Sequence, residues 1–309
     1  MTAADLTALR AAFGERLRTG EPLSRHTSFR IGGPADAFIE ADSVAEVHEV
    51  LTLAARAGTP LFVLGGGTNI LVSDNGIRGI VLKLGRAFAA MEWQANGSGT
   101  KVRAGAAVPF KKLVVEAAQR RLTGLEFAEG IPGLLGGGLL MNAGAFGGEI
   151  ANVVEAIEGV DAATGPQQLP KADLSFGYRH FDLPRGWIVT HLSLRLAAGD
   201  PGSIRDLMAE YKQRRQLHQP LGYPNAGSIF KNPPGRHAGE LIEAAGFKGR
   251  RIGGARVSEQ HANFIVNLGG ATATEVRALM NEIARSVWER WGVRLDPEVR
   301  LVGHWEDPA

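Results

Sequence analysis

A serine, an arginine and a glutamate lie in three separate stretches of the chain, and they could present a hydroxyl, a cation and a carboxylate to a ligand. Ser228 lies in the loop 225–233 (NAGSIFKNP), between a flexible glycine and apolar residues, where its hydroxyl could face a substrate. Arg179 and Glu298 supply a cation and a carboxylate. Each also has a commoner structural explanation, as a loop serine bonded to backbone or as a surface charge. No GxSxG elbow surrounds Ser228, so the serine is not indicated as a hydrolase nucleophile.

Two glycine-rich stretches indicate a long ligand that contacts the backbone. Residues 65–72 (GGGTNILV) follow a strand-like run, and their unshielded N–H groups could form an anion-binding nest. This loop matches neither a GxGxxG fingerprint nor a Walker loop. Residues 130–148 hold eight of the 41 glycines, and each glycine would cost a helix roughly 1 kcal/mol relative to alanine. We interpret the first loop as a pyrophosphate-binding site and the second as the segment that lies along an isoalloxazine ring. A tight turn and close helix–sheet packing around 136–138 are the structural alternatives.

Composition excludes several other classes of protein. The 309 residues carry a formal net charge of only +2, so no nucleic-acid surface is expected. The chain has no cysteine, which rules out disulfides, thiolate metal sites and a cysteine-linked flavin. His237 and His261 lack ligand spacing, so no metal site is predicted. Met1–Arg18 is typical of a charged amphipathic helix, not of a signal peptide, and no apolar run approaches the roughly 18 residues of a membrane span. We therefore expect a cytoplasmic protein without a membrane partner.

Hydrophobic periodicity predicts a mixed α and β chain with a break near residue 200. Helical spacing covers 43–57, 110–121, 204–217, 237–246 and 273–291. Strand-like runs cover 60–64, 79–84, 101–104, 187–196, 262–268 and 293–302. Residues 220–234, rich in Pro, Gly and Asn, are predicted to form a loop. The sequence GDPG at 199–202 interrupts the pattern and predicts a domain boundary there.

Eight sequence blocks, taken together, resemble one known family. In chain order they are HTSFRIGGPA (26–35), GGGTNILV (65–72), GIPG (130–133), MNAGAFGGE (141–149), GYR (177–179), AGSIFKNP (226–233), SEQHANFIVN (258–267) and DPEVRLVG (296–303). Their order and spacing resemble the UDP-N-acetylenolpyruvoylglucosamine reductase family from about residue 22 to 303. The compact segment after Tyr178 is similar to the shorter subtype of that family, which lacks a tyrosine-bearing insertion.

The resemblance implies an α+β fold with two parts. The first is an FAD-binding domain of the vanillyl-alcohol-oxidase (PCMH) type, placed at 22–199 as two α+β subdomains divided near residue 85. A C-terminal strand around 300–309 could return to this domain. The second is a smaller C-terminal α+β substrate-binding domain, placed at 203–300. FAD is expected to be non-covalent, in keeping with the absence of cysteine and of a histidine beside the 65–72 loop.

The resemblance also implies a reaction and roles for individual residues. NADPH would reduce FAD, and the flavin would then reduce UDP-N-acetylglucosamine enolpyruvate to UDP-N-acetylmuramate for peptidoglycan precursor synthesis. Ser228 would donate a proton, Arg179 would bind the substrate carboxylate, and Glu298 would hydrogen-bond that carboxylate or relay a proton to it. The residues expected to bind FAD are Gly65, Gly66, Gly67, Thr68, Asn69, Ile70, Leu71, Gly130, Ile131, Pro132, Gly133, Asn142, Ala143, Gly144, Gly147 and Gly148. The residues expected to bind the UDP-sugar are Tyr178, Arg214, Gln219, Lys231, Asn232 and His261; His218 stands where the family often carries threonine.

Two other functions remain open at this point. An FAD-dependent sugar or alcohol oxidase of the same fold would share the glycine loops, but it would have no need of Ser228, Arg179 and Glu298 in these contexts. A non-catalytic flavin- or UDP-sugar-binding protein would have no reason to keep all three. A monomer is expected, and the sequence leaves open how strongly NADPH is preferred over NADH.

Overall fold

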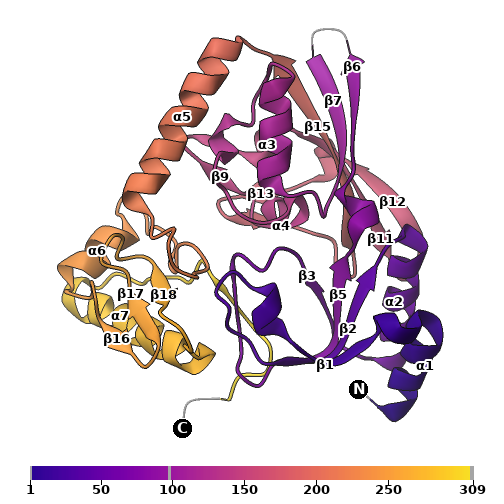
Figure 1. Ribbon diagram of the computed structural model, residues 1–309, viewed down its shortest axis with the longest axis horizontal. Helices are drawn as coiled ribbons and strands as arrows, with labels where there is room; N and C mark the ends of the chain where they lie inside the picture. The colour runs from indigo at the N-terminus through magenta and orange to yellow at the C-terminus, as the bar shows by residue number, and fades with distance from the viewer. Residues whose placement is uncertain (1, 97–98, 307–309) are drawn as a thin grey trace. The chain divides into compact units, whose positions relative to one another are not determined.

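The computed structural model describes residues 2–96 and 99–306 and shows the mixed α and β chain that was predicted (Figure 1). These residues cluster into two compact units, each assembled from separate stretches of sequence. Unit 1 comprises Met1–Arg18, Ala37–Gly66 and Gly79–Arg215, and unit 2 comprises Thr19–Asp36, Gly67–Arg78 and Gln216–Ala309. The predicted break near residue 200 falls inside unit 1, because the helix that follows it packs Met208 against the core of that unit.

A six-stranded antiparallel sheet is the largest element of unit 1. Its strands follow the order β12-β11-β15-β7-β6, with β8 paired to β15. The bounds are β6 Met91–Asn96, β7 Gly99–Gly105, β8 Leu122–Thr123, β11 Val154–Asp161, β12 Gly165–Pro170 and β15 Ile188–Ala198. The first seven residues of β15 are buried except His191, as expected for a central strand. Residues 135–140 of the glycine-rich stretch pack against β15 of this sheet.

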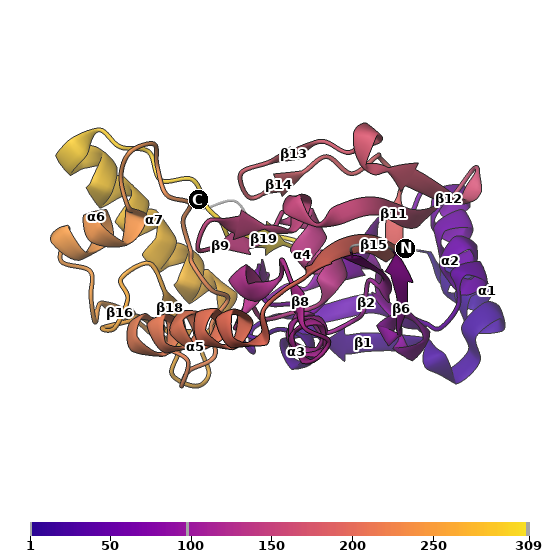
Figure 2. The same ribbon diagram turned by 90° about the horizontal axis from the view of Figure 1, so that it is seen from above.

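A second sheet has the order β1-β2-β5-β3, in which β3 and β5 run parallel. The bounds are β1 Arg18–Pro22, β2 Pro34–Ala41, β3 Leu61–Leu64 and β5 Ile77–Leu84. Helix α2 (Val44–Ala57) connects β2 to β3 and packs beside β11 and β12 (Figures 1 and 2). The Ser43 hydroxyl accepts from the Glu46 amide at 3.1 Å, and Gly58, at φ 61°, ends the helix. The predicted helix at 43–57 is therefore confirmed.

Further elements of residues 2–218, as the structure describes them, are four helices, several two-residue strands and six 3-10 turns. The other helices are α1 Ala3–Phe13, α3 Phe110–Gln119, α4 Leu135–Leu140 and α5 Pro201–His218. Two-residue strands are β9 Gly144–Ala145, β10 Gly148–Glu149, β13 Phe176–Gly177 and β14 His180–Phe181. The 3-10 turns are η1 Gly14–Arg16, η2 Leu23–His26, η3 Arg86–Ala89, η4 Glu126–Ala128, η5 Ile150–Asn152 and η6 Lys171–Asp173. Across the residues that the structure describes, no helix is both long and apolar enough to cross a membrane.

Helix α4 shows that part of the second glycine-rich stretch serves packing. Its Gly136, Gly137 and Gly138 are helical, although such a density of glycine disfavours a helix. A Cβ at Gly136 would lie 2.9 Å from the Ala106 Cβ, and a Cβ at Gly138 would lie 3.0 Å from a Phe110 ring carbon. Close packing, the structural alternative for these positions, therefore explains two of the three glycines.

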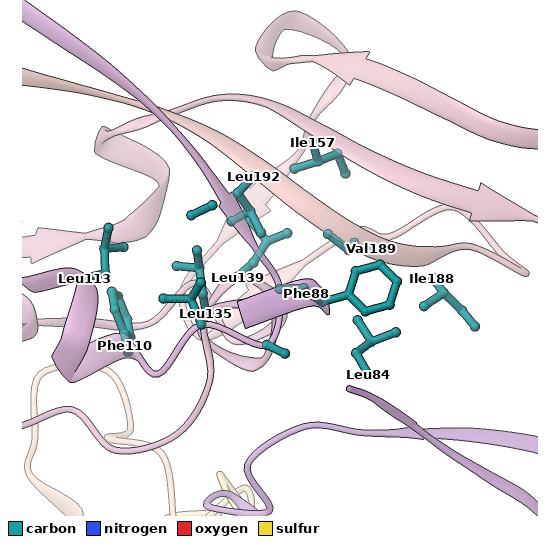
Figure 3. Packing of buried hydrophobic residues seen from close by; sticks show 14 of the residues in the cluster. Leu84, Phe88, Phe110, Leu113, Leu135, Leu139, Ile157, Ile188, Val189 and Leu192 are labelled. Atoms are coloured by element: carbon teal, nitrogen blue, oxygen red, sulfur yellow. The ribbon is translucent and has the colours of Figure 1, made fainter. Parts of the chain in front are cut away.

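The core of unit 1 lies where α3 and α4 meet the large sheet (Figure 3). Phe88, Phe110, Leu135, Leu139 and Leu192 are among its fully buried side chains. Burial of each such side chain stabilises the fold by about 1.5–3 kcal/mol. Because α4 contributes Leu135 and Leu139 to this core, the glycine loops on either side of α4 start from a fixed helix.

Unit 2 joins the C-terminal third of the chain to two earlier stretches. Its elements are the sheet β16-β17-β18 (Arg251–Ile252, Ala255–Val257, Ile265–Asn267), helices α6 Ala238–Ala244 and α7 Ala273–Trp291, and the parallel pair β4 Ile70–Val72 and β19 Arg300–Val302. Phe29, Ile31 and Leu71 share one hydrophobic cluster with residues of α7. The predicted strand 293–302 is confined to its last three residues, and the predicted strand 262–268 to Ile265–Asn267. The compact units therefore differ from a single division of the chain near residue 200, because 19–36 and 67–78 pack with the C-terminal core.

Asp74 joins one of these early stretches to α7, and its loss is expected to destabilise unit 2. Its carboxylate accepts from the amide of Ala273 at 2.8 Å and from the amide of Thr274 at 2.9 Å, in the first turn of the helix. A carboxylate there satisfies unpaired N–H groups and complements the helix dipole. We expect Asp74→Ala to lower the free energy of unfolding by about 1 kcal/mol, and Asp74→Asn by less. The measurement is the shift of the urea midpoint at constant m-value, and an unshifted midpoint for Asp74→Ala would contradict the assignment.

Candidate active site

The predicted site residues fall into two groups, one in each unit. Unit 1 holds Gly65, Gly66, Gly130, Ile131, Pro132, Gly133, Asn142, Ala143, Gly144, Gly147, Gly148, Tyr178, Arg179 and Arg214. Unit 2 holds Gly67, Thr68, Asn69, Ile70, Leu71, Gln219, Ser228, Lys231, Asn232, His261 and Glu298. The loop GGGTNILV is therefore divided between the units after Gly66. Within each unit the fold brings several of these residues together.

In unit 1 the two glycine-rich stretches touch. A Cβ at Gly66 would lie 2.8 Å from the Gly133 Cα and 3.2 Å from the Leu134 nitrogen. Gly133 has φ 102°, a conformation that favours glycine. A Cβ at Gly65, in contrast, would meet no atom within 4 Å. The fold thus places the backbones of both predicted cofactor loops against each other and leaves space beside Gly65.

Asn142 orders the second of these loops from within the protein. It is buried, with only 1% of its surface exposed, and it adopts φ 39°. Its Nδ2 donates to the Gly177 carbonyl at 3.0 Å, and its Oδ1 accepts from the Ala151 amide at 3.1 Å. The side chain therefore links residues 141–149 to the segment that carries Tyr178 and Arg179. Because both of its polar atoms have protein partners, Asn142 would contact a cofactor through its backbone.

Arg179 lies against the same loop. Its Nη1 donates to the Gly144 carbonyl at 2.9 Å, and its guanidinium carbon lies 5.3 Å from the centre of the Tyr178 ring. Arg179 is a non-glycine residue with φ 55°, an uncommon conformation that persists only where surrounding contacts impose it. The loop 141–149 and the predicted carboxylate-binding arginine are thus one local structure.

Arg215 is a second cation of this region and is not among the residues predicted from the sequence. Its guanidinium carbon lies 5.4 Å from the centre of the Phe146 ring, and Phe146 stacks on Tyr211 with ring centres 4.0 Å apart. Its Nε is buried and has no hydrogen-bond partner among the described residues. Burial lowers the pKa of the Arg215 guanidinium below its usual value, Glu129 partly offsets this, and the nearby Arg179 lowers it further. Two neighbouring guanidinium groups of like charge favour an anion between or beside them.

Helical periodicity could have distinguished Arg215 from Arg214. Positions 204, 208, 211 and 215 repeat at intervals of three and four residues, which place them on one face of α5. Ile204 is buried on that face, and Met208 packs against the core of unit 1. Arg214 lies on another face, where 59% of its side chain is exposed and its Nη2 pairs with the Glu210 carboxylate at 2.5 Å. Of the two arginines, Arg215 is therefore the one on the face of α5 that packs against unit 1. Its side chain lies close to Gly130, because a Cβ at Gly130 would lie 2.7 Å from the Arg215 Cδ.

In unit 2 the segment that carries Ser228 is held on both sides. On one side the Ile229 amide donates to the Asn263 carbonyl at 2.9 Å. On the other side the Glu298 amide donates to the Ile229 carbonyl at 2.8 Å. Gly227, at φ 76°, turns the chain directly before Ser228. The candidate proton donor and the candidate carboxylate thus lie on hydrogen-bonded neighbouring segments.

Asn69 of the first glycine loop contacts the same segment of unit 2. Its Nδ2 donates to the Glu298 carbonyl at 3.1 Å, and its own carbonyl accepts from the Arg300 amide at 3.0 Å. The parallel pairing of β4 with β19 continues this contact. Unit 2 therefore brings together Asn69, Ser228 and Glu298, which lie far apart in the sequence.

Gly67 forms a tight turn of unit 2. It has φ 62°, and a Cβ there would lie 2.1 Å from the His26 carbonyl oxygen. Its carbonyl accepts from the Ser28 amide at 3.0 Å, and the Ser28 hydroxyl donates to the Asn225 carbonyl at 2.7 Å. Within this loop, Gly67 therefore fits the interpretation as a tight turn, whereas Gly65 fits the interpretation as a ligand contact.

The other predicted substrate contacts of unit 2 are less tightly grouped. The Asn232 Oδ1 accepts from the Ala238 amide at 3.0 Å at the start of α6, which is a structural role. His261 packs on Phe264 with ring centres 4.9 Å apart. Lys231 donates its backbone amide to the Asp296 carbonyl at 2.9 Å. Among the described residues, no group of three His, Asp or Glu side chains could hold a metal ion.

Two family profiles match successive parts of the chain. Residues 35–167 match a family described as FAD binding domain. Residues 219–302 match a family described as UDP-N-acetylenolpyruvoylglucosamine reductase, C-terminal domain. The chain is thus of the FAD-binding class with a distinct C-terminal domain, which confirms the predicted fold class.

Relatives that match more than nine-tenths of the chain identify the family within this class. The chain is 46% identical to UDP-N-acetylenolpyruvoylglucosamine reductase 2 of Symbiobacterium thermophilum, over 95% of each protein. It is 44% identical to the UDP-N-acetylenolpyruvoylglucosamine reductase of Caldanaerobacter subterraneus, over 93% of this chain and 94% of that protein. The crystal structure of the Thermus caldophilus reductase is similar with a TM-score of 0.78 at 37% identity, covering 91% of this chain and 97% of that one. The chain belongs to the UDP-N-acetylenolpyruvoylglucosamine reductase family, as its motifs predicted.

Proposed function

We propose that this protein catalyses the NADPH-dependent, FAD-mediated reduction of UDP-N-acetylglucosamine enolpyruvate to UDP-N-acetylmuramate, a step of peptidoglycan precursor synthesis. The observation that carries this proposal is the arrangement in unit 2, where Ser228 and Glu298 lie on neighbouring hydrogen-bonded segments. A proton donor and a carboxylate partner require such proximity. Membership of the family over nearly the whole chain supports the same reaction, cofactor and co-substrate.

The residues of the glycine loops fit a non-covalently bound FAD. The loops at Gly66 and Gly133 touch, and the absence of neighbours within 4 Å of a Cβ at Gly65 leaves room for a ligand group beside the backbone. We assign the cofactor to these loops, to residues 142–148, and to Gly67–Leu71. When bound, FAD supplies the hydride for the enol ether, which it obtains from NADPH.

Gly65 and Gly66 provide a matched pair of variants for this assignment. Gly65→Ala adds a Cβ that meets no protein atom within 4 Å, so we expect unfolding of the apoprotein to change by less than about 0.5 kcal/mol. We expect the same variant to bind FAD at least about tenfold more weakly, because the added methyl occupies ligand space. Gly66→Ala pushes a Cβ to 2.8 Å from the Gly133 Cα and should lower apoprotein stability by about 1–3 kcal/mol. FAD titration followed by flavin fluorescence, and urea unfolding of the apoproteins, measure the two effects; unaltered FAD affinity of Gly65→Ala would contradict the assignment.

Ser228 is proposed to deliver a proton to the substrate. A serine hydroxyl is a weak acid, so it can act only on a strongly basic, carbanion-like carbon such as the one beside the substrate carboxylate. Glu298 is held beside this segment by its own amide, which donates to the Ile229 carbonyl at 2.8 Å. We assign to its side chain a hydrogen bond to the substrate carboxylate or the relay of a proton.

Arg179 and Arg215 are proposed to bind the anionic groups of the substrate. Each guanidinium can bond a carboxylate or a phosphate in a bidentate manner. Arg179 is assigned the carboxylate on which charge builds during reduction, where fixed cations are most effective. Arg215, held over Phe146, is assigned a second anionic contact. Further contacts to the UDP-sugar are proposed for Tyr178, Gln219, Lys231, Asn232 and His261, and the contact first predicted for Arg214, which is exposed and paired with Glu210, is reassigned to Arg215.

The domain assignment, the oligomeric state and the location also belong to this proposal. We assign FAD binding to a domain over 22–199 and substrate binding to a domain over 203–300, in agreement with the order of the matched family profiles. We further propose a cytoplasmic monomer. Sedimentation equilibrium of the holoenzyme at two concentrations tests the monomer, and fractionation of expressing cells tests the location.

Anaerobic stopped-flow spectroscopy tests the reaction directly. The flavin of the purified holoenzyme is reduced with NADPH and then mixed with UDP-N-acetylglucosamine enolpyruvate. Rapid reoxidation with formation of UDP-N-acetylmuramate is the expected result. Flavin that stays reduced until oxygen is admitted would overturn the proposal and favour an oxidase.

A further inference from the structure

Asn263 is a buried asparagine whose side chain pairs with the segment that carries Ser228. Only 4% of its surface is exposed. Its Oδ1 accepts from the Phe230 amide at 3.0 Å, and its Nδ2 donates to the Phe230 carbonyl at 2.8 Å. The carboxamide therefore satisfies both backbone groups of Phe230, as a neighbouring strand would.

The two sides of the Ser228 segment are held by different means. Residues 296–298 contribute backbone bonds: the Glu298 amide donates to the Ile229 carbonyl and the Asp296 carbonyl accepts from the Lys231 amide. On the opposite side the Asn263 carbonyl accepts from the Ile229 amide, and both bonds to Phe230 come from the Asn263 side chain. Gly227 before Ser228 has no side chain to restrain the turn. Two of these three bonds therefore come from a carboxamide that one substitution can alter.

His261 supports Asn263 in turn. The Nδ1 of His261 accepts from the Asn263 amide at 3.1 Å, which requires that this nitrogen carry no proton. Burial lowers the pKa of His261, and the neighbouring His218 and Lys248 lower it further, while Glu243 acts in the opposite direction. A lowered pKa favours the neutral ring, so the acceptor persists to a lower pH than an unperturbed histidine would allow.

We propose that Asn263 is a positioning residue for Ser228, acting through the backbone of Ile229 and Phe230, and that the Nδ1 atom of His261 holds Asn263 in place. This inference rests on the proposed function, since it assigns Ser228 the proton transfer. A misplacement of about 1 Å by a residue outside the chemistry can cost roughly 100-fold in rate. The geometry of proton delivery, and not substrate affinity, is what Asn263 controls.

Asn263→Asp tests the carboxamide with little change of shape. The carboxylate cannot donate to the Phe230 carbonyl, so the 2.8 Å bond is lost. We expect substrate-dependent flavin reoxidation to slow by roughly 100-fold, with KM for the UDP-sugar and NADPH-dependent flavin reduction within about threefold of the parent. The solvent isotope effect on reoxidation should also rise, because proton transfer becomes limiting.

Asn267→Asp is the matched control for this variant. Asn267 is an equally buried asparagine of unit 2, and its Nδ2 donates to the Phe29 carbonyl at 3.0 Å. We expect both half-reactions of this variant to stay within about threefold of the parent. Slowing of both half-reactions to the same extent in Asn263→Asp and Asn267→Asp would mean a general structural effect and would overturn the proposal.

Two substitutions of His261 distinguish the hydrogen-bond acceptor at Nδ1 from the packing of the imidazole ring. His261→Asn places a carboxamide oxygen near the position of Nδ1 without a titrating group, and His261→Phe keeps a ring without an acceptor. Because the pKa of His261 lies below the ordinary histidine value of about 6.5, the parent reoxidation rate should hold through that pH and fall only at lower pH. His261→Asn should remove that limb, and His261→Phe should be slow at every pH. An unchanged acid limb in His261→Asn would exclude His261 from this role.

Amide hydrogen exchange of residues 226–233 gives a readout that does not depend on turnover. The Phe230 amide should exchange faster in Asn263→Asp than in the parent or in Asn267→Asp, because the carboxylate is repelled by the Phe230 carbonyl and moves away from the neighbouring amide as well. Faster exchange together with unaltered reoxidation would overturn the positioning role. If the parent holoenzyme does not reduce the UDP-sugar, the proposed function fails, while the exchange experiment still decides whether Asn263 orders the segment.

Discussion

Ser228→Ala is expected to slow the substrate-dependent reoxidation of reduced flavin by about 100–10,000-fold, the range that positioned proton transfer contributes. Reduction of the flavin by NADPH should be unchanged, because that half-reaction takes no proton from Ser228. The segment itself should persist, since the Ile229 amide and carbonyl keep their partners at 2.9 and 2.8 Å. The loss should therefore fall on kcat, with KM close to the parent value. Single-turnover stopped flow measures both half-reactions.

Ser28→Ala is the control that distinguishes proton delivery from order in the same region. The Ser28 hydroxyl donates to the Asn225 carbonyl at 2.7 Å, just before the turn at Gly227. Its removal should cost about 1 kcal/mol of stability but less than about tenfold in reoxidation rate. Reoxidation of Ser228→Ala within about threefold of the parent would remove Ser228 from the mechanism.

The individual elements could be predicted from local signals, whereas their grouping could not. Helix α2 was predicted within one residue, because Ser43 caps its start and Gly58 its end. The assignment of 19–36 and 67–78 to unit 2 has no local signal. It depends on contacts such as that between Asp74 and Thr274, which lie 200 residues apart. Periodicity describes one element at a time, so it does not report such partners.

The candidate site divides in the same way. Ser228, Arg179 and Glu298 were identified through motifs of the family, and their roles stay predictions. The role of Asn263 in holding the Ser228 segment was hidden, because Asn263 within HANF has no sequence feature that distinguishes it from an ordinary polar residue. The choice of Arg214 over Arg215 had a different cause. Adjacent arginines differ only in helical phase, and α5 has to be anchored by Ile204 and Met208 before that phase is known.

Arg215→Met is expected to raise KM for the UDP-sugar by about 10–100-fold. A charge-assisted hydrogen bond contributes about 1.5–3 kcal/mol, and each 1.4 kcal/mol corresponds to about tenfold in affinity. The methionine side chain can keep the packing on Phe146, which lies 5.4 Å from the guanidinium. Because burial and Arg179 already disfavour the charged form of Arg215, its removal should not destabilise the free protein. Arg215→Lys should be intermediate, since it keeps the charge without the planar fork.

Arg214→Met tests whether the effect on KM for the UDP-sugar depends on the position of the arginine on the helix or on its charge alone. The Arg214 side chain is 59% exposed and pairs with Glu210, and surface pairs of this kind contribute about 0–1 kcal/mol. We therefore expect KM of Arg214→Met to stay within about threefold of the parent. Steady-state kinetics over UDP-sugar concentration, together with equilibrium binding to the oxidised enzyme, measure both variants. A large KM increase for Arg214→Met with none for Arg215→Met would return the substrate contact to Arg214. The aromatic stack of Phe146 on Tyr211 would then hold Arg215 for packing alone.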